Sequence, residues 1–268
     1  MNIKYLLFLL YCLFSTVAYS ADYTFGVVPQ YSREHMREMW VPFTNYLSQL
    51  TGHNFIFKTE ITISKFMDNV QAGNYDIIYT NPVSYVLANR KHDYTAFAKE
   101  VDTKLQGVIV VRTSSEDINT VDDLANLEVA HPDGQASLSQ ITASYLKFKN
   151  IKTDTVYLGS HEIVFCSVAN GLYISGTGSL KVLETLPSDI RDKLKIIWTS
   201  EPFQSHAFAA LPTVPKSVVS DIVDAMLSMN NSENKKIYLN MIKFKGFEVV
   251  TDKDWDSIRK FMNGGNNK

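Results

Sequence analysis

Short runs rich in β-branched and aromatic residues alternate with longer amphipathic runs along this chain, and that alternation limits the folds it can adopt. The longest helical run, Arg33 to Leu50, has Ser32 before it and Gly52 just beyond its end, which are typical residues for the two helix caps. A shorter helical run, 121–125, follows Thr120. Strands are predicted at 23–28, 54–58, 75–79, 106–112, 128–130, 155–158, 195–199 and 206–211. This order predicts an α/β protein built around largely parallel sheets.

The first twenty residues carry one lysine, an apolar run from Tyr5 to Phe14, and the sequence Ala18-Tyr19-Ser20. This is the pattern of a secretory signal peptide, cleaved near Ser20 and Ala21. The apolar run is too short to span a membrane, and no later stretch resembles a spanning segment. We therefore expect an exported, soluble mature chain of residues 21–268.

Cys166 is the one cysteine that remains once residues 1–20 are removed, so no disulfide can form within the mature chain. Stability must therefore come from the burial of apolar surface. The full sequence is 45% hydrophobic, and its length allows one large core or two smaller ones, at roughly 100 to 200 residues per domain. We expect two lobes.

The formal net charge of the full chain is -2, and acidic and basic residues are interleaved along it. Such a balance argues against a nucleic-acid partner and against a polybasic membrane patch. Recognition of a ligand must then depend on local groups.

The chain contains, in order, FGVVPQYSREHMREMWVPFTNYLSQLTG (25–52), QAGNYDIIYTNPVSYVLA (71–88), GVIVVR (107–112), VDDLANLEVAHPDGQASLSQ (121–140), GSHEIVFCSVANG (159–171), IIWTSEPF (196–203) and KGFEVVTDKDWDSIRK (245–260). These segments resemble the periplasmic substrate-binding proteins of phosphonate, phosphite and phosphate importers. The resemblance covers nearly the whole mature chain.

The resemblance implies an α/β fold of the type II periplasmic binding protein class, with two lobes, two hinge crossovers and a ligand cleft between the lobes. GVIVVR (107–112) and HAFAAL (206–211) would be the crossovers. Lobe one would then comprise 21–107 plus 207–268, and lobe two 108–206. Unpaired amide groups at helix N-termini would favour an anion in the cleft.

The stretch HPDGQASLSQ (131–140) leaves a predicted strand and opens a helix. In the phosphonate binders, a Ser-Thr-Ser-Gly run at this place holds the anion. Aligned without gaps, that run falls on Ala136, Ser137, Leu138 and Ser139, so that Ser137 alone keeps a hydroxyl directly. Gln135 and Ser139 are partial substitutes, and the backbone amides remain available. The alternative is a plain helix start, capped by Asp133 or Ser137.

The run GSHE (159–162) matches the Gly-Ser-His-Asp run of the family, in which the histidine contacts the ligand. Ser160 is a candidate N-cap, and His161 would lie in the first helical turn, where it can donate to an anion. The alternative is an ordinary surface or capping histidine.

The run DIIYTNPVSYVLA (76–88) matches a family strand that ends in a turn before a tyrosine-bearing helix. The resemblance implies that Tyr79, Asn81, Ser84 and Tyr85 lie at the edge of the cleft. Asn81 replaces the usual glycine and adds an amide. Asn81 could also cap a helix that has Pro82 at its first position, and both roles can hold at once.

Other positions depart from the phosphonate pattern. Tyrosines of the family fall near Leu105 and Ile63, and an acidic residue that would hold a ligand amino group falls near Lys181. These changes argue against an aminoalkylphosphonate, and a more apolar or a more anionic ligand is equally compatible.

Neither a metal site nor a cofactor is predicted. His131, His161 and His206 would fall near the cleft, but their spacing is not that of a metal motif. No GxSxG elbow is present, and Cys166 lies in a helical run that favours a structural role. We therefore expect no enzyme activity.

The function predicted from the sequence is that of a periplasmic solute-binding protein, which captures a small anionic ligand for an ABC importer. The expected partners are that ligand and a membrane permease, and a monomer is expected. The alternative is a ligand-sensing module of the same fold that signals to a membrane receptor. Both uses depend on closure driven by ligand affinity, so one chain cannot separate them.

Overall fold

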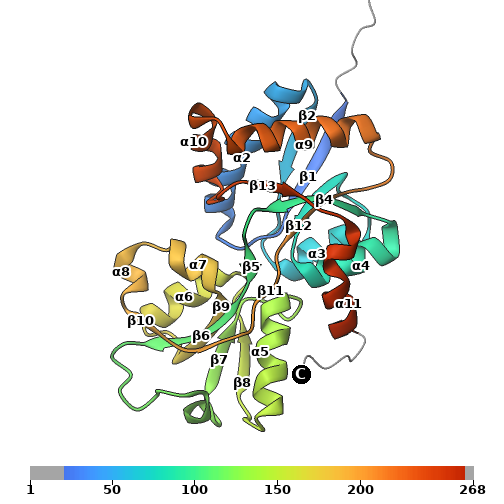
Figure 1. Ribbon diagram of the computed structural model, residues 1–268. Helices are drawn as coiled ribbons and strands as arrows, with labels where there is room; N and C mark the ends of the chain where they lie inside the picture. The colour runs from blue at the N-terminus through green and yellow to red at the C-terminus, as the bar shows by residue number, and fades with distance from the viewer. Residues whose placement is uncertain (1–20, 263–268) are drawn as a thin grey trace, which may run out of the picture.

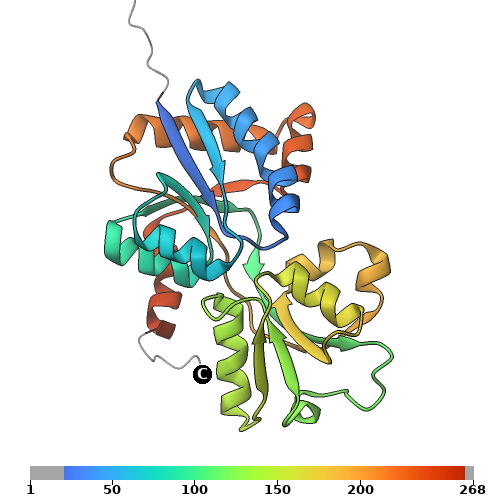
Figure 2. The ribbon, with the colours of Figure 1, turned by 180° about the vertical axis from the view of Figure 1, so that it is seen from behind.

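The computed structural model describes residues 21–262, which form two lobes, each built around its own sheet (Figures 1 and 2). The predicted signal peptide lies outside the described residues. Between residues 21 and 262, no helix is both long and apolar enough to cross a membrane.

Lobe one is built on a six-stranded sheet with the order β13-β4-β12-β3-β1-β2. Its strands are β1 (Asp22–Val27), β2 (Asn54–Lys58), β3 (Ile77–Thr80), β4 (Thr95–Glu100), β12 (Ala207–Ala210) and β13 (Phe247–Val249). Its helices are α2 (Arg33–Thr51), α3 (Ile63–Gln71), α4 (Pro82–His92), α9 (Lys216–Asn230), α10 (Lys236–Met241) and α11 (Asp256–Met262), with the 3-10 turns η2 (Glu233–Lys235) and η3 (Asp252–Trp255). Both ends of the sequence therefore contribute to one sheet.

Lobe two is built on a five-stranded sheet with the order β10-β6-β9-β7-β8. Its strands are β6 (Gly107–Arg112), β7 (Glu128–His131), β8 (Asp154–Tyr157), β9 (Ser175–Ser179) and β10 (Leu194–Thr199). Its helices are α5 (Ser137–Phe148), α6 (His161–Ala169), α7 (Leu180–Thr185) and α8 (Ser188–Arg191), with the 3-10 turn η1 (Val121–Leu124). The helical run predicted at 121–125 is thus a 3-10 turn.

The chain passes between the lobes twice, on β5 (Lys104–Leu105) and β11 (Phe203–Gln204), which pair antiparallel. These strands lie beside the segments that were expected to cross over. The expected segments are themselves interior strands, because β6 pairs with β9 and β10, and β12 pairs with β3 and β4. The crossings are therefore the short pieces that join one sheet to the other, as Figure 1 shows at the centre of the molecule.

Both sheets are mixed, which corrects the prediction of largely parallel sheets. In lobe one, β1 runs parallel to β2 and β3, but β12 runs antiparallel to β3 and β4. In lobe two, β7 runs parallel to β8 and β9, but β6 runs antiparallel to β9 and β10. Strands β6 and β12 enter their sheets directly from the other lobe and run antiparallel to their neighbours, and β13 also runs antiparallel to β4.

Local capping explains why α2 has the limits that the sequence predicts. The Ser32 hydroxyl accepts a hydrogen bond from the His35 amide at 3.4 Å. At the other end, Gly52 adopts φ 75° and its amide donates to the Ser48 carbonyl. The predicted caps are therefore confirmed, and the start of the helix is fixed next to the interface between the lobes.

An aromatic cluster fixes the ends of β3 and β12. The Tyr79 ring lies 5.1 Å from that of Trp40, 4.6 Å from that of Phe208 and 5.5 Å from that of Phe244. All four side chains are buried. Aromatic packing of this kind is worth about 0.5–1.5 kcal/mol per pair beyond burial. It holds the two strand ends from which Asn81 and His206 extend.

Strand β9 has the sequence SGTGS, which the strand prediction missed because glycine has a low strand propensity. It lies at the centre of the second sheet, between β6 and β7. Added Cβ atoms at Gly176 and Gly178 would lie 2.5 Å from Val164 Cγ1 and 2.3 Å from Phe165 Cζ. The glycines therefore allow α6 to pack directly against the strand, which places the start of α6 at the interface between the lobes.

Two carboxylates of lobe two bind helix starts of lobe one. Asp133 accepts hydrogen bonds from the Ser64 amide at 2.9 Å and the Ser64 hydroxyl at 2.5 Å, in the first turn of α3. Glu162 accepts from the Ser32 amide at 2.6 Å and lies 2.8 Å from Nδ1 of His35, at the start of α2. Negative charge at a helix N-terminus is favoured, so both contacts hold the lobes together.

The pKa of the Glu162 carboxyl reflects these contacts. Burial alone would raise the pKa, but hydrogen bonds from His35 and the Ser32 amide outweigh it, and the pKa is lowered. A carboxyl with a lowered pKa contributes stability that is present above its ordinary pKa and lost as pH falls through the lowered value. The interface is therefore stabilised at neutral pH.

The lobes are also joined beside the crossing strands. Lys181 of α7 forms an ion pair with Glu100 of β4, and its Nζ lies 4.3 Å above the ring of Phe244. The Glu100 carboxylate also accepts from the Lys245 amide at 3.1 Å. A third contact joins the Tyr31 hydroxyl to Thr185 Oγ1 at 2.8 Å. Hydrogen bonds and ion pairs therefore join the lobes at several places.

We predict that Gly178→Ala lowers the free energy of unfolding by about 1–3 kcal/mol, because the new methyl group would overlap the Phe165 ring. Urea unfolding measures the change. Gly134→Ala is the matched control, since its Cβ would lie at an ordinary 3.4 Å from the Tyr157 ring. Wild-type stability of Gly178→Ala would show that α6 does not depend on this close approach.

We predict that Glu162→Gln lowers the free energy of unfolding at pH 7 by about 1–3 kcal/mol, the range for charged hydrogen bonds. The gap from the wild type should shrink as pH falls below 4.5, the ordinary pKa of the group, because the wild-type carboxyl then protonates. Unfolding is measured across pH 7 to 3, with the exposed Glu116→Gln as control. A gap independent of pH would contradict the role of the charge.

Candidate ligand-binding site

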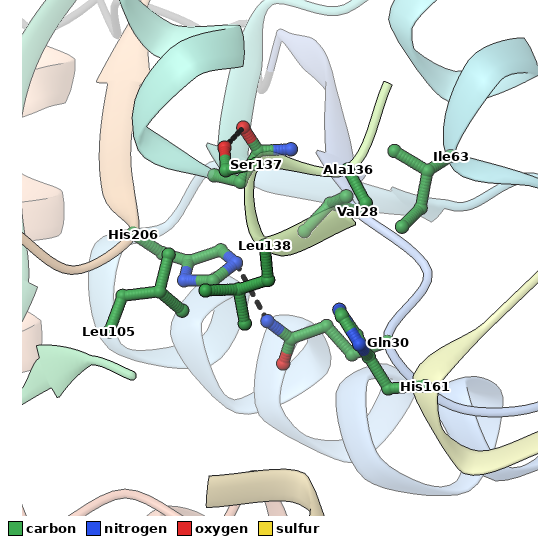
Figure 3. Close-up of a pocket in the computed structure, with 10 residues that line it drawn as sticks. Val28, Gln30, Ile63, Leu105, Ala136, Ser137, Leu138, His161 and His206 are labelled. Atoms are coloured by element: carbon green, nitrogen blue, oxygen red, sulfur yellow. Dashed lines mark hydrogen bonds between the residues drawn. The ribbon is translucent and has the colours of Figure 1, made fainter. Parts of the chain in front are cut away.

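A small cavity lies between the lobes, next to the crossing strand β5. Its volume is about 10 Å³, which is room for about one water molecule. The lining residues are Val28, Gln30, Ile63, Asn81, Leu105, Ala136, Ser137, Leu138, His161 and His206 (Figure 3). The cavity is therefore built from both lobes.

Four of the described helices begin at this cavity. Ile63, Ser137 and His161 are the first residues of α3, α5 and α6, and Asn81 is the N-cap of α4. The first amides of a helix have no partner within the helix, and its dipole places partial positive charge there. The start of several helices at one place is an arrangement that favours an anion.

Asn81 and Ser137 join the two lobes at the cavity. The Asn81 side-chain oxygen accepts from the Ser84 amide at 2.9 Å, so the predicted cap of α4 is confirmed. The same oxygen accepts from the Ser137 hydroxyl at 2.6 Å, a contact drawn as a dashed line in Figure 3. Asn81 therefore has both roles at once: it caps α4 and it lines the cavity.

The sequence left open that α5 is a plain helix start capped by Asp133 or Ser137. Neither side chain caps the helix. Ala136 is the N-cap residue, and no side chain caps the helix. Asp133 is instead engaged by the Gln135 amide at 2.8 Å and by Ser64 of the other lobe. The amides at the start of α5 are thus left without a side-chain cap.

His161 is buried at the start of α6, as its place in GSHE predicts. Ser160 caps the helix, since its hydroxyl accepts from the Ile163 amide at 3.3 Å. Nδ1 of His161 is buried and has no hydrogen-bond partner within the described residues. Burial lowers the pKa of the imidazole to about 4, so the ring is neutral at neutral pH. An unpaired polar atom in a cavity marks a place where a ligand can bond.

His206 and Gln30 form a second polar group in the cavity. Gln30 Nε2 lies 2.7 Å from His206 Nε2, as Figure 3 shows. An amide nitrogen only donates, so Nε2 of His206 accepts and the ring proton lies on Nδ1. Burial lowers the pKa of His206 to about 3, with Lys181 and His161 adding to the effect. The ring is therefore a neutral imidazole, stacked on Tyr79 at 5.2 Å.

Gln30 was not among the residues predicted for the site. The signal that could have found it is its position just after β1, since the carboxyl ends of parallel strands meet at one edge of the sheet. His206 was placed near the cleft by the sequence, but only as a candidate metal ligand. Sequence reasoning thus found the helix starts and missed this pair.

The other predicted site residues do not line the cavity. Tyr79 is buried in the aromatic cluster and supports the ring of His206. Tyr85 donates to Asp252 Oδ1 at 2.5 Å and packs on the Trp255 ring, within lobe one. Gln135 is exposed, while Ser84 and Ser139 are buried with hydroxyl groups that have no partner within the described residues. The structure thus brings together Asn81, Ser137 and His161, and leaves the remaining five outside.

The described residues contain no group of three His, Cys, Asp or Glu side chains that could hold a metal ion. His131 is bonded elsewhere, with its Nδ1 at 3.1 Å from Thr177 Oγ1 within lobe two. His161 and His206 lie at the cavity without a carboxylate or thiol beside them.

Two solved structures similar to this chain come from phosphonate-related proteins. A binding protein component of an ABC phosphonate transporter from Pseudomonas aeruginosa has a TM-score of 0.82 at 17% identity, over 92% of this chain and 87% of its own. PhnD1 from Prochlorococcus marinus, solved in complex with methylphosphonate, has a TM-score of 0.81 at 15% identity, over 91% of this chain and 99% of its own. These likenesses show the two-lobed fold.

Sequence comparisons extend to the family. The phosphate-import protein PhnD of Mycolicibacterium smegmatis is 20% identical, over 88% of this chain and 83% of its own length. The family described as ABC transporter, phosphonate, periplasmic substrate-binding protein matches residues 25–255, which is most of the chain. The chain therefore belongs to the periplasmic substrate-binding proteins of ABC phosphonate transporters.

Proposed function

We propose that this chain captures a small oxyanion of the phosphonate, phosphite and phosphate class in the cavity between its lobes and presents it to the permease of an ABC importer. The observation that carries the proposal is the start of four described helices at one cavity, with the unpaired Nδ1 of His161 among them. The names of the relatives, one a phosphate-import protein and one a methylphosphonate complex, support the ligand class.

The side chains proposed to contact the anion are Asn81 from lobe one, and Ser137 and His161 from lobe two. Ser137 would donate its hydroxyl to the anion in place of Asn81 Oδ1, to which it donates now, and His161 would donate one ring N–H. The amides at the starts of α5 and α6 would donate whatever the side chains are. Neutral donors suit this place because a cation buried in it would repel the positive ends of the helices. Binding and release involve no covalent step, so the proposal includes no catalysis.

The lobes are proposed to move about the strand pair β5 and β11. The proposed lobe boundaries are 21–107 plus 207–268 for lobe one and 108–206 for lobe two, which follow the division into two sheets. A ligand that contacts both lobes binds the closed arrangement better than an open one, and it shifts the population by that difference in affinity. Asp133 and Glu162, each bonded to the opposite lobe, would add to closure without contacting the ligand.

The protein is proposed to act as an exported monomer after cleavage near Ser20 and Ala21. The composition of residues 1–20 supports export, and the family to which the chain belongs is periplasmic. The balanced charge supports a small-molecule ligand and not a nucleic acid. The permease of an importer is preferred to a sensor as the membrane partner, because the phosphate-import protein of Mycolicibacterium smegmatis and the binding protein of Pseudomonas aeruginosa are named as import or transport components.

We predict that phosphate, phosphite or methylphosphonate raises the melting temperature of the mature protein, while sulfate and acetate at the same concentration do not. A ligand at 100 times its Kd should add about 2.7 kcal/mol to the free energy of unfolding. Thermal unfolding screens the set, and calorimetric titration gives the Kd. Absence of binding by any phosphorus oxyanion would rule out the proposed ligand class and leave the fold unaffected.

We predict that Ser137→Ala and His161→Ala each raise the Kd of the tightest-binding oxyanion by about 10- to 100-fold. This is the equivalent of losing one charge-assisted hydrogen bond. The matched control is Gln140→Ala on the same helix α5, since Gln140 is exposed and bonds only the Gly134 carbonyl at 3.3 Å. Calorimetric titration measures the Kd, and circular dichroism checks folding. If the control weakens binding as much as the two variants, the proposed contacts are not those of the site.

A further inference from the structure

The lining of the cavity carries no ionised side chain at neutral pH. Its apolar members are Val28, Ile63, Leu105, Ala136 and Leu138. Its polar members are two amides, one hydroxyl and two imidazoles, and burial keeps both imidazoles neutral. A ligand in this cavity therefore meets neutral hydrogen-bonding groups on one part of its surface and hydrocarbon on the rest.

Among the described residues no carboxylate lines the cavity, and those that lie between the lobes are bonded to other groups. Asp133 is bonded to Ser64 and to the Gln135 amide. Glu162 is bonded to the Ser32 amide and to His35. A third carboxylate, Glu100, is also bonded to groups outside the lining of the cavity.

Glu100 is paired with Lys181, and it also accepts from the Lys245 amide. It lines a separate groove of about 460 Å³ beside the crossing strands, and not the cavity. Burial and the nearby Lys181 both lower the pKa of His206, so this side of the cavity carries no negative charge. A ligand ammonium in the cavity would lose its water and find no carboxylate in the lining.

The cavity has an apolar part, which can take an uncharged substituent of a ligand. Figure 3 shows Leu105 and Leu138 together beside the pair of His206 and Gln30. With the lobes in contact the cavity measures about 10 Å³, so each added heavy atom must be accommodated by separating groups that now bond across the interface, such as Ser137 and Asn81. Compact substituents are therefore favoured over long ones.

We propose that the site selects phosphorus oxyanions with a compact, uncharged substituent, such as hydrogen or methyl, and rejects aminoalkylphosphonates, with His206 and Gln30 as the specificity-determining pair. This inference rests on the proposed function and names the ligand class of the same site. The neutral imidazole of His206 accepts from Gln30, so the pair is hydrogen-bonded but carries no negative charge, and a buried ammonium needs a negative charge to offset its lost hydration.

Calorimetric titration of the wild-type mature protein with methylphosphonate, propylphosphonate and 2-aminoethylphosphonate tests this inference without any substitution. The last two ligands have the same number of heavy atoms and differ in one terminal group. The ratio of their Kd values therefore measures the effect of the ammonium alone. We expect 2-aminoethylphosphonate to bind at least about 100-fold more weakly than propylphosphonate, and propylphosphonate at least about 10-fold more weakly than methylphosphonate.

The outcomes separate this inference from the proposed function. Binding of 2-aminoethylphosphonate as tight as that of propylphosphonate overturns the inference and leaves the oxyanion function standing. Binding of propylphosphonate as tight as that of methylphosphonate overturns the preference for compact substituents. Failure of phosphate, phosphite and all three phosphonates to bind overturns the proposed function, and the inference with it.

His206→Asp and His206→Asn form a matched pair that assigns the specificity to this position. Both side chains can accept the hydrogen bond of Gln30, and they differ by one negative charge. The Kd of 2-aminoethylphosphonate divided by that of propylphosphonate is the quantity compared. We expect it to be at least about 10-fold smaller in the Asp variant than in the Asn variant. Thermal unfolding checks that both variants fold. Equal ratios in the two folded variants would overturn the assignment of His206 and Gln30.

Discussion

Carboxylates of one lobe bind the first amides of helices in the other lobe, and these contacts set the spacing on which the rest of the structure depends. Asp133 bonds Ser64 at the start of α3, and Glu162 bonds Ser32 at the start of α2. Each contact combines a charged hydrogen bond with the field of a helix dipole, and the two effects have the same sign. The lobes are thus held in one register, with a small cavity between them.

The same arrangement decides the electrostatics of the cavity. Asp133 and Glu162 are satisfied by amides at the starts of α3 and α2, and among the described residues no carboxylate lines the cavity, at which α4, α5 and α6 also begin. His161 and His206 add hydrogen-bonding capacity without adding charge, because desolvation keeps both rings neutral. A buried, unpaired cation would cost several kcal/mol, whereas neutral dipoles cost far less when buried. The site is therefore positive in potential and neutral in formal charge.

Backbone donors explain how one fold can keep an anion site while its side chains change. Relatives at 15% to 20% identity share the fold or the family, although this chain has lost two of the hydroxyls expected at the start of α5. Amides at a helix start depend on backbone geometry, which survives substitution as long as the helix begins at the same place. In the proposed site, side chains such as Leu138 and His206 would then set which substituent the ligand can carry.

The sequence by itself determined the features that depend on neighbouring residues. The caps at Ser32, Asn81 and Ser160 are hydrogen bonds to amides three residues further along the chain, so short motifs suffice to place the starts of α2, α4 and α6. Eight of the strands were likewise readable from local periodicity and composition, whereas β4, β5, β9, β11 and β13 were not predicted. The family resemblance rested on the residues of seven segments.

Tertiary structure alone decided which of those residues meet. Tyr85 shares a motif with Asn81, yet it packs on Asp252 and Trp255, because successive residues of a helix point in different directions. Strand β9 was hidden because its glycines are selected by the close approach of α6 and not by strand propensity. Gln30 and His206 are 176 positions apart in the sequence, and only the return of the chain through β11 and β12 brings their side chains to one cavity.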